Sequence, residues 1–206
     1  MDTERSRRWD EKYRTGLPGW DRQGASPALL HWLETGALTA CRILIPGCGH
    51  GYEVLELARR GFEVWGLDIA PTPLARLKAR LAEAGLAAHL VQADALAWQP
   101  EHPFDAIYEQ TCLCALAPEE WPAYAAQLYR WIKPGGLMFA LFMQTGRPGG
   151  PPYHCDPGEM LTLLPSERWE WVEPPHREVP HPNGLFEYAA VLRRRNGSHP
   201  HPCPAC

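Results

Sequence analysis

Short apolar runs alternate with stretches of helical periodicity over most of this chain. The apolar runs, which predict buried strands, are residues 42–46, 62–67, 88–92, 104–108 and 137–143. The stretches with apolar side chains three and four positions apart, which predict helices, are residues 52–60, 72–84 and 118–131. Alternation of this kind forms βαβ units, whose crossovers are right-handed. We therefore predict an α/β fold, a doubly wound and mostly parallel sheet with helices on both faces.

The N-terminal region departs from this alternation. Residues 3–14 form a predicted helix that places Trp9 and Tyr13 on one face. A second helix is expected to begin at Ser26-Pro27, because serine caps a helix and proline suits its first turn. About the first 25 residues are rich in aromatic and charged side chains, and Trp20 follows Tyr13 after the helix-breaking segment 16–19.

The C-terminal third has weaker patterns and more proline. Residues 169–172 and 185–192 alternate between apolar and polar positions, so we expect them to add an antiparallel pair at one edge, giving seven strands. One domain is predicted over residues 1–195. Residues 196–206 are rich in His, Pro and Cys and are expected to be a disordered tail.

Composition and charge narrow the functional classes. The 206 residues are 45% hydrophobic and 21% charged, which excludes wholesale disorder. No apolar stretch approaches the roughly 20 residues of a membrane helix, and no apolar run follows the first arginines as in a signal peptide. A net charge of −4 offers no global basic field for nucleic acid. We expect a cytoplasmic monomer that acts on a small molecule, with neither a membrane nor nucleic acid as partner.

The seven cysteines are expected to be reduced thiols, because the chain has no export signal. The tail holds His199, His201, Cys203 and Cys206, which are ligand types for zinc or copper(I). Prolines between these residues keep the backbone extended, and no second Cys/His cluster accompanies them. We therefore expect no metal, with metal binding by the tail as the alternative.

The strongest chemical signal is a glycine turn, Gly47-Cys48-Gly49-His50-Gly51, directly after the first predicted strand. Such a turn lets the backbone approach a ligand closely and aims a helix N-terminus at it. The dinucleotide fingerprint requires a third glycine where this chain has Tyr52. The turn therefore suits a ligand without a pyrophosphate.

Two carboxylates follow the next two strands. Asp68 lies 21 residues after Gly47, where a carboxylate can accept both ribose hydroxyls, and Ile69 is placed to lie against a purine. Asp94 ends the third strand, where it can accept from an adenine amine. Each aspartate has a structural alternative: Asp68 can cap the following helix, and Asp94 can stabilise a turn. Together with the glycine turn they predict an adenosine pocket.

These residues resemble a family. The segment from Ile43 to Gly51 looks like motif I of S-adenosylmethionine-dependent methyltransferases of the thiopurine methyltransferase superfamily. Trp9-Asp10-x-x-Tyr13 and Pro18-Gly19-Trp20-Asp21 resemble its aromatic cap, and Gly149-Gly150-Pro151-Pro152-Tyr153 is similar to its thiol and halide branch. The resemblance covers residues 9–192 and implies a Rossmann-like class I methyltransferase fold.

The resemblance also implies S-adenosyl-L-methionine as methyl donor. Combined with the residue-based reading, the expected cofactor contacts are Trp9, Tyr13, Trp20, Gly47, Gly49, Asp68, Ile69, Asp94, Ala95 and Gln110. Related branches carry tryptophan in place of Tyr13, and tyrosine or arginine in place of Gln110. The departure at Gln110 leaves acceptor selectivity open, because that loop borders the methyl group. Aromatic faces attract a sulfonium cation, although core packing is the alternative role for the cap aromatics.

The predicted function is methylation of a small, soft nucleophile, namely a thiol, hydrosulfide, halide or thiopurine-like acceptor. Pro152 and Tyr153 are expected in the acceptor wall, with Arg147 as a candidate for an anionic acceptor. No catalytic base is assigned, because this displacement neutralises charge and gains most from alignment and exclusion of water. The alternatives are a methyltransferase for tellurite, selenite or arsenite, and a non-catalytic protein that binds an adenosyl ligand.

Overall fold

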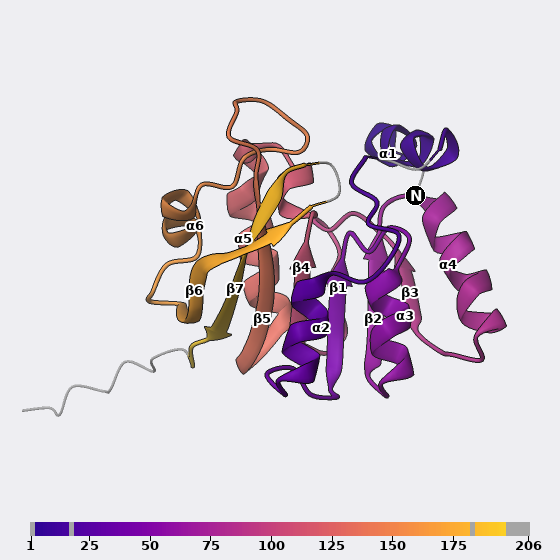
Figure 1. Ribbon diagram of the computed structural model, residues 1–206, viewed down its shortest axis with the longest axis horizontal. Coiled ribbons are helices and arrows are strands. Elements are labelled where there is room, and N and C mark those ends of the chain that lie inside the picture. The colour runs from indigo at the N-terminus through magenta and orange to yellow at the C-terminus, as the bar shows by residue number, and fades with distance from the viewer. Residues whose placement is uncertain (1–2, 17–18, 182–183, 197–206) are drawn as a thin grey trace, which may run out of the picture.

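The computed structural model describes residues 3–16, 19–181 and 184–196. Its centre is a sheet of seven strands in the order β3-β2-β1-β4-β5-β7-β6 (Figure 1). The parallel strands are β1 (Arg42–Pro46), β2 (Glu63–Asp68), β3 (His89–Gln92), β4 (Phe104–Gln110) and β5 (Ile132–Gln144). The antiparallel strands are β6 (Trp169–Pro180) and β7 (Phe186–Arg194). The predicted doubly wound, mostly parallel sheet with an antiparallel edge is confirmed.

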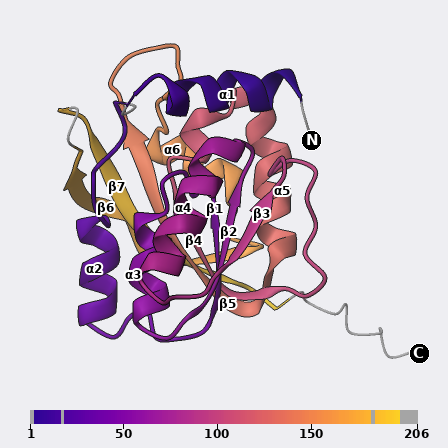
Figure 2. The same cartoon turned by 90° about the vertical axis from the view of Figure 1, so that its right-hand side faces the viewer.

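Helices cover both faces of this sheet (Figure 2). One face carries α2 (Pro27–Glu34), α3 (Tyr52–Arg59) and α4 (Pro71–Glu83), and their core side chains include Trp32, Leu57 and Leu77. The other face carries α5 (Trp121–Trp131) and α6 (Pro157–Leu163), with Tyr124, Leu128 and Met160 in a second apolar layer. The two layers are the core that fixes the strand ends in place.

Some boundaries differ from the sequence prediction for identifiable reasons. The helix expected over 118–131 is divided into a 3₁₀ turn, Pro118–Glu120, and α5, because Pro122 lacks an N–H and fits only a first helical turn. The expected turn at 133–136 lies within β5, where the pairing with β4 shifts register. Helix α6 was not predicted; Asp156 caps it by accepting the N–H groups of Gly158 and Glu159.

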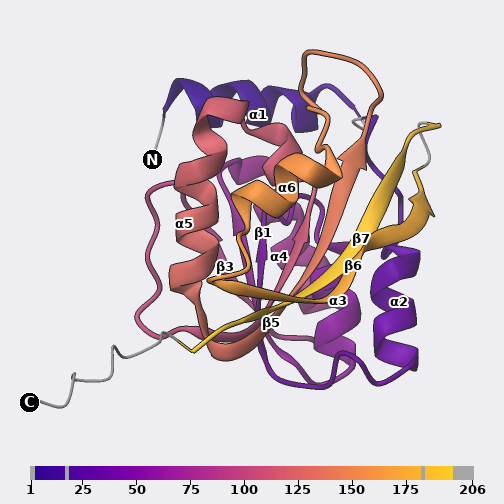
Figure 3. The same ribbon diagram turned by 90° about the vertical axis from the view of Figure 1, so that its left-hand side faces the viewer.

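A separate helix, α1 (Glu4–Arg14), lies across the carboxyl ends of the strands (Figures 1 and 2). It docks beside α4 through polar contacts: the Ser6 hydroxyl donates to Ile69 O at 2.8 Å, and Asp10 accepts the Thr72 N–H at 2.7 Å. The loop between β5 and α6 rises at the same end of the sheet (Figure 3). Together they cover the strand ends from which the predicted ligand residues come.

Across the described ranges, no helix is both long and apolar enough to cross a membrane. The tail residues His199, His201, Cys203 and Cys206 lie outside the described residues.

Candidate functional site

A cavity of about 270 Å³ lies beneath α1 at the carboxyl ends of the strands. Its wall is assembled from the cap, the glycine turn, the ends of β2 and β3, the loop after β4, and the β5–α6 loop. Among the residues predicted from the sequence, those that line it are Trp9, Tyr13, Trp20, Gly47, Asp68, Ile69, Asp94, Ala95 and Pro152. Segments that are distant in sequence therefore converge on one space.

The glycine turn is shaped by close neighbours. Gly47 and Gly49 both have positive φ, of 63° and 49°, which side chains rarely adopt. A Cβ on Gly47 would lie 2.9 Å from Cys112 Cβ, and a Cβ on Gly49 would lie 2.7 Å from the Tyr13 hydroxyl. The absence of side chains here allows the cap and the loop after β4 to approach the turn.

The Asp68 carboxylate is buried and oriented by the backbone. Oδ2 accepts the Gly49 N–H and Oδ1 accepts the Ala70 N–H, both at 2.8 Å. Burial raises the pKa of Asp68, and these hydrogen bonds oppose that rise. Each oxygen retains a second acceptor position, so bonding at the start of α4 leaves capacity for a ligand hydroxyl.

The two carboxylate oxygens of Asp94 also have different partners. Oδ1 accepts the Leu96 N–H at 2.9 Å, which stabilises the turn after β3, while Oδ2 lies 3.6 Å from Arg5 Nη1. Arg5 also forms an ion pair with Glu120 and lines the cavity. Sequence reasoning missed Arg5, although its position four residues before Trp9 places both side chains on one helical face.

The cap aromatics form a connected group over the turn. The Trp9 and Trp20 rings meet edge to face at 5.6 Å, and Tyr13 meets Trp20 edge to face at 5.9 Å. Tyr13 is buried, whereas Trp9 and Trp20 are half-buried and line the cavity. Part of each indole surface is therefore available to a ligand. A role in core packing alone would leave this exposure unexplained.

A smaller polar cavity of about 70 Å³ adjoins the first and shares Tyr13, Trp20, Gly47 and Thr111 with it. Gly49 and Gln110, both predicted as cofactor contacts, line this second cavity. Its lining residues include the acidic and basic side chains of Asp21, Arg22, His50, Glu53 and His181. Asp21 lies 2.8 Å from His50 Nδ1, and this pair joins the cap loop to the glycine turn.

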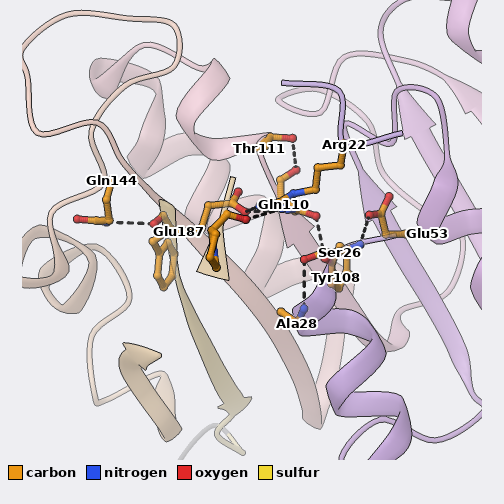
Figure 4. Close-up of polar contacts among 11 residues, drawn as sticks. Arg22, Ser26, Ala28, Glu53, Tyr108, Gln110, Thr111, Gln144 and Glu187 are labelled. Atoms are coloured by element: carbon orange, nitrogen blue, oxygen red, sulfur yellow. Dashed lines mark hydrogen bonds and ion pairs between the residues drawn. The ribbon is translucent and has the colours of Figure 1, made fainter. Parts of the chain in front are cut away.

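Behind the second cavity, the side chain of Gln110 belongs to a buried network (Figure 4). Its Nε2 donates to Glu187 Oε2 at 2.8 Å, and its Oε1 accepts from the Tyr108 hydroxyl at 2.8 Å. Glu187 also pairs with Arg22 at 2.6 Å. Burial raises the pKa of Glu187, and the Arg22 guanidinium opposes that rise. The sequence analysis did not predict Arg22 or Glu187. Glu187 is an acidic residue within the predicted strand 185–192, and this departure from the apolar pattern could have indicated a functional position.

The loop after β4 forms another wall and is unusual in its backbone. Thr111 has φ of +61°, a conformation strained for a β-branched residue, and lies between the two cavities. Beneath the loop, Glu109 accepts the Leu113 N–H at 2.7 Å. Burial raises the pKa of Glu109 to about 7.

The remaining wall of the first cavity is largely apolar. It includes Met143, Cys114, Leu116, Pro151 and Pro152. Burial raises the pKa of Cys112 and Cys114 well above the ordinary thiol range, so these lining thiols stay protonated.

The other acceptor-side candidates do not line this wall. Tyr153 donates its N–H to Cys114 O at 2.7 Å, and Arg147 lies exposed on the β5–α6 loop. His154 Nδ1 accepts the Thr145 N–H at 3.1 Å. Within the part of the chain that the structure describes, no three His, Cys, Asp or Glu side chains are grouped to hold a metal.

Known proteins are similar to this chain in sequence and in fold. A family model described as thiopurine S-methyltransferase matches residues 4–195. The chain is 34% identical over 167 residues to "Probable thiol methyltransferase 2" of Arabidopsis thaliana, covering 80% of this chain and 74% of that protein. It is 34% identical over 151 residues to "Thiocyanate methyltransferase 1" of the same plant, covering 72% of this chain and 66% of that protein.

A solved structure gives the corresponding fold. The 1,6-didemethyltoxoflavin-N1-methyltransferase of Burkholderia thailandensis, with bound 1,6-didemethyltoxoflavin and S-adenosylhomocysteine, superposes with a TM-score of 0.71 at 18% identity. The match covers 93% of this chain and 87% of that one. The expected class I methyltransferase fold is thereby confirmed.

Proposed function

The chain belongs to the thiopurine S-methyltransferase family and is an S-adenosyl-L-methionine-dependent methyltransferase, and we propose that it methylates a small, soft nucleophile beneath α1. The acceptor class is a thiol, hydrosulfide, halide or thiopurine-like compound. The observation that carries the proposal is the convergence of Trp9, Trp20 and the glycine turn on one cavity with an apolar far wall. Relatives named for thiols and thiocyanate support this acceptor class.

We assign the adenosine half of the donor to the first cavity. Asp68 accepts from the ribose hydroxyls, Ile69 lies against the purine, and Asp94 and Ala95 hold the adenine edge. The free acceptor capacity of Asp68 and the close approach that Gly47 and Gly49 permit fit such a ligand. Trp9 and Trp20 then face the sulfonium, which aromatic rings attract.

The amino-acid end of the donor suits the second cavity, because that cavity offers charges of both signs. Arg22 Nε is buried and has no hydrogen-bond partner among the described residues, so it can serve a carboxylate. Asp21 and Glu53 can serve an ammonium group. Gly49 and Gln110 belong to this part of the site.

The donor supplies an electrophilic methyl group, and the chain supplies alignment and a dry surround. Methyl transfer from a sulfonium to an anion neutralises charge, so a water-poor apolar wall favours it. Met143, Leu116 and Pro152 form that wall. We propose no general base: His154 and Asp156 are committed to structural hydrogen bonds, and the acceptor arrives already ionised.

The lining thiols bear on selectivity. Cys112 and Cys114 remain protonated because burial raises the pKa of both, so they compete poorly with an ionised acceptor. Because we assign no general base, acceptors that ionise near neutral pH, such as hydrosulfide, and permanently anionic ones, such as thiocyanate and iodide, are favoured over alkyl thiols, whose ordinary pKa is about 8.5.

Calorimetry and product detection test this function. Wild-type protein is titrated with S-adenosylhomocysteine and with 5′-methylthioadenosine, which lacks the amino-acid end; we expect binding of both and tighter binding of the former. Headspace analysis then follows methylated volatiles formed from hydrosulfide, thiocyanate and iodide. Binding without product from any of these acceptors would refute the proposed acceptor class, and failure to bind either ligand would refute the assigned donor site.

We further propose that the protein works as a cytoplasmic monomer, as one domain over residues 1–195, on a small molecule without nucleic acid or membrane partners. The net charge of −4 supports the absence of a nucleic-acid partner. Light scattering of the purified full chain tests the monomeric state; a dimer mass at micromolar concentration contradicts it.

A further inference from the structure

Arg5 extends from α1 and lines the first cavity. It lies one helical turn before Trp9 on α1, and its guanidinium meets carboxylates from two other elements. Nη2 pairs with Glu120, in the 3₁₀ turn that precedes α5, and Nη1 lies 3.6 Å from Asp94 Oδ2 at the end of β3. The side chain is therefore held in place from two sides.

Nη1 of Arg5 is buried and has no hydrogen-bond partner within residues 3–16, 19–181 and 184–196. A buried N–H without an acceptor is unfavourable, and this one belongs to a residue that lines a ligand cavity. Asp94 is its complement. Oδ1 accepts the Leu96 N–H, and Oδ2 faces Arg5 at a distance longer than a hydrogen bond. A donor and an acceptor therefore lie side by side at the cavity wall.

We propose that Arg5 and Asp94 together read one edge of the adenine base, and that Arg5 is a specificity-determining residue for the methyl donor. The exocyclic amine of adenine donates a hydrogen bond, and each ring nitrogen flanking it, N1 or N7, accepts one. The amine meets Asp94 Oδ2, and one flanking nitrogen meets Arg5 Nη1. This inference rests on the proposed placement of adenine beside Asp94.

The guanidinium supplies what a neutral side chain cannot. Arginine is a donor with no acceptor atom, so at this position it donates a hydrogen bond to a ring nitrogen and cannot pair with an N–H. Glu120 holds Nη2, which directs Nη1 toward Asp94.

A chemical double-mutant cycle tests the inference. Wild type and Arg5→Gln are titrated calorimetrically with S-adenosylhomocysteine and with its 1-deaza and 7-deaza analogues, each of which lacks one flanking nitrogen. We expect Arg5→Gln to weaken binding of S-adenosylhomocysteine about tenfold, the effect of losing one charge-assisted hydrogen bond. For one deaza analogue, the same substitution should change affinity less than twofold.

Controls separate base reading from cap stability. Arg14→Gln alters an exposed arginine on the same helix and should leave all affinities unchanged. Arg5→Lys keeps a positive charge for Glu120 but loses the planar guanidinium. It should show the same difference between S-adenosylhomocysteine and the deaza analogue, with a smaller loss of affinity. This variant replaces Arg5→Gln if Arg5→Gln unfolds at a low temperature.

The outcomes are distinct. Equal weakening for all three ligands would mean that Arg5 only holds the cap, which overturns the inference. Wild-type affinity in Arg5→Gln for S-adenosylhomocysteine overturns it as well, while leaving the donor site intact. If the wild type itself fails to bind S-adenosylhomocysteine, the proposed donor site is refuted and the inference with it.

Discussion

The Asp68 carboxylate accepts two backbone hydrogen bonds, from Gly49 and from Ala70, before it meets any ligand. One fixes the glycine turn and the other fixes the entry to α4. A single side chain thus ties the conformation of two loops to the position of an acceptor group in the cavity. The sequence predicted this residue because a carboxylate at the end of β2 suits a ribose, but the two backbone donors depend on the folded path of the chain.

Replacing Asp68 with alanine should weaken S-adenosylhomocysteine binding by about 1–3 kcal/mol, since it removes a charged hydrogen-bond acceptor. Isothermal titration measures this directly. Glu63→Ala, at the opposite end of the same strand and exposed, should leave affinity unchanged. Equal affinity in Asp68→Ala and wild type would exclude the ribose assignment.

Glu109 predicts a stability effect with a defined sign. Its pKa is raised to about 7 in the native protein, against an ordinary value of 4.5, so the native state holds a proton that the unfolded state releases. Stability contributed by this group is complete below pH 4.5 and is lost as pH rises toward 7, by about 3 kcal/mol in total.

Glu109→Gln should therefore stabilise the protein at pH 8 by up to about 3 kcal/mol and have little effect near pH 4.5, because glutamine stays neutral and can still accept from Leu113. Urea denaturation at both pH values measures the difference, with Glu167→Gln, on the exposed surface, as control. A gain that is equal at both pH values would show that ionisation of Glu109 is not the cause.

At the level of elements, periodicity was sufficient for the sheet and most of its helices. The strand at 42–46 matches β1 residue for residue, because the buried apolar residues Ile43, Leu44 and Ile45 are followed by Pro46 and the glycine turn, which end the strand. Helix α6 was missed since it is short and preceded by a proline-rich loop. The placement of Tyr153 and Arg147 in the acceptor wall remains a prediction from resemblance. Within the β5–α6 loop, the residues that line the cavity are Pro151 and Pro152. The sequence does not predict this choice, because the conformation of a loop depends on tertiary contacts.

Helix α1 is held to the rest of the fold by few hydrogen bonds, so its attachment should be sensitive to substitution. Ser6 donates to Ile69 O between β2 and α4, Asp10 accepts from Thr72, and Arg76 donates to Tyr13 O. Hydrogen bonds of this kind on a surface helix contribute little net stability. We expect Asp10→Ala, which removes the acceptor for the first turn of α4, to increase amide exchange in residues 4–14 by about tenfold and leave β4 and β5 protected. Glu11→Ala, at an exposed position of α1, is the control. Unchanged exchange in α1 would show that other contacts hold the cap.

At the scale of the whole molecule, four carboxylates with raised pKa lie at or close to the two cavities. Asp68 lines the first cavity and Glu53 lines the second, Glu109 lies beneath the loop after β4, and Glu187 is hydrogen-bonded to Gln110. Burial raises the pKa of Glu53 to about 6 and that of Glu109 to about 7, and it also raises the pKa of Asp68 and Glu187. All of these groups favour the protonated native state, so the free energy of unfolding should fall as pH rises from about 5 to 7. Urea titrations at pH 5.5, 6.5 and 7.5 test this; a flat or rising profile contradicts the set of raised values.

The carboxylates near the cavities should favour binding of the methyl donor over binding of the by-product. The methyl donor carries a sulfonium charge, and the by-product left after transfer carries a neutral thioether in its place. Carboxylates near the cavity attract the first more than the second, by Coulomb forces that strengthen in a dry site. Product inhibition should consequently ease as these groups ionise, so that the ratio of by-product to donor dissociation constants increases between pH 6 and 8.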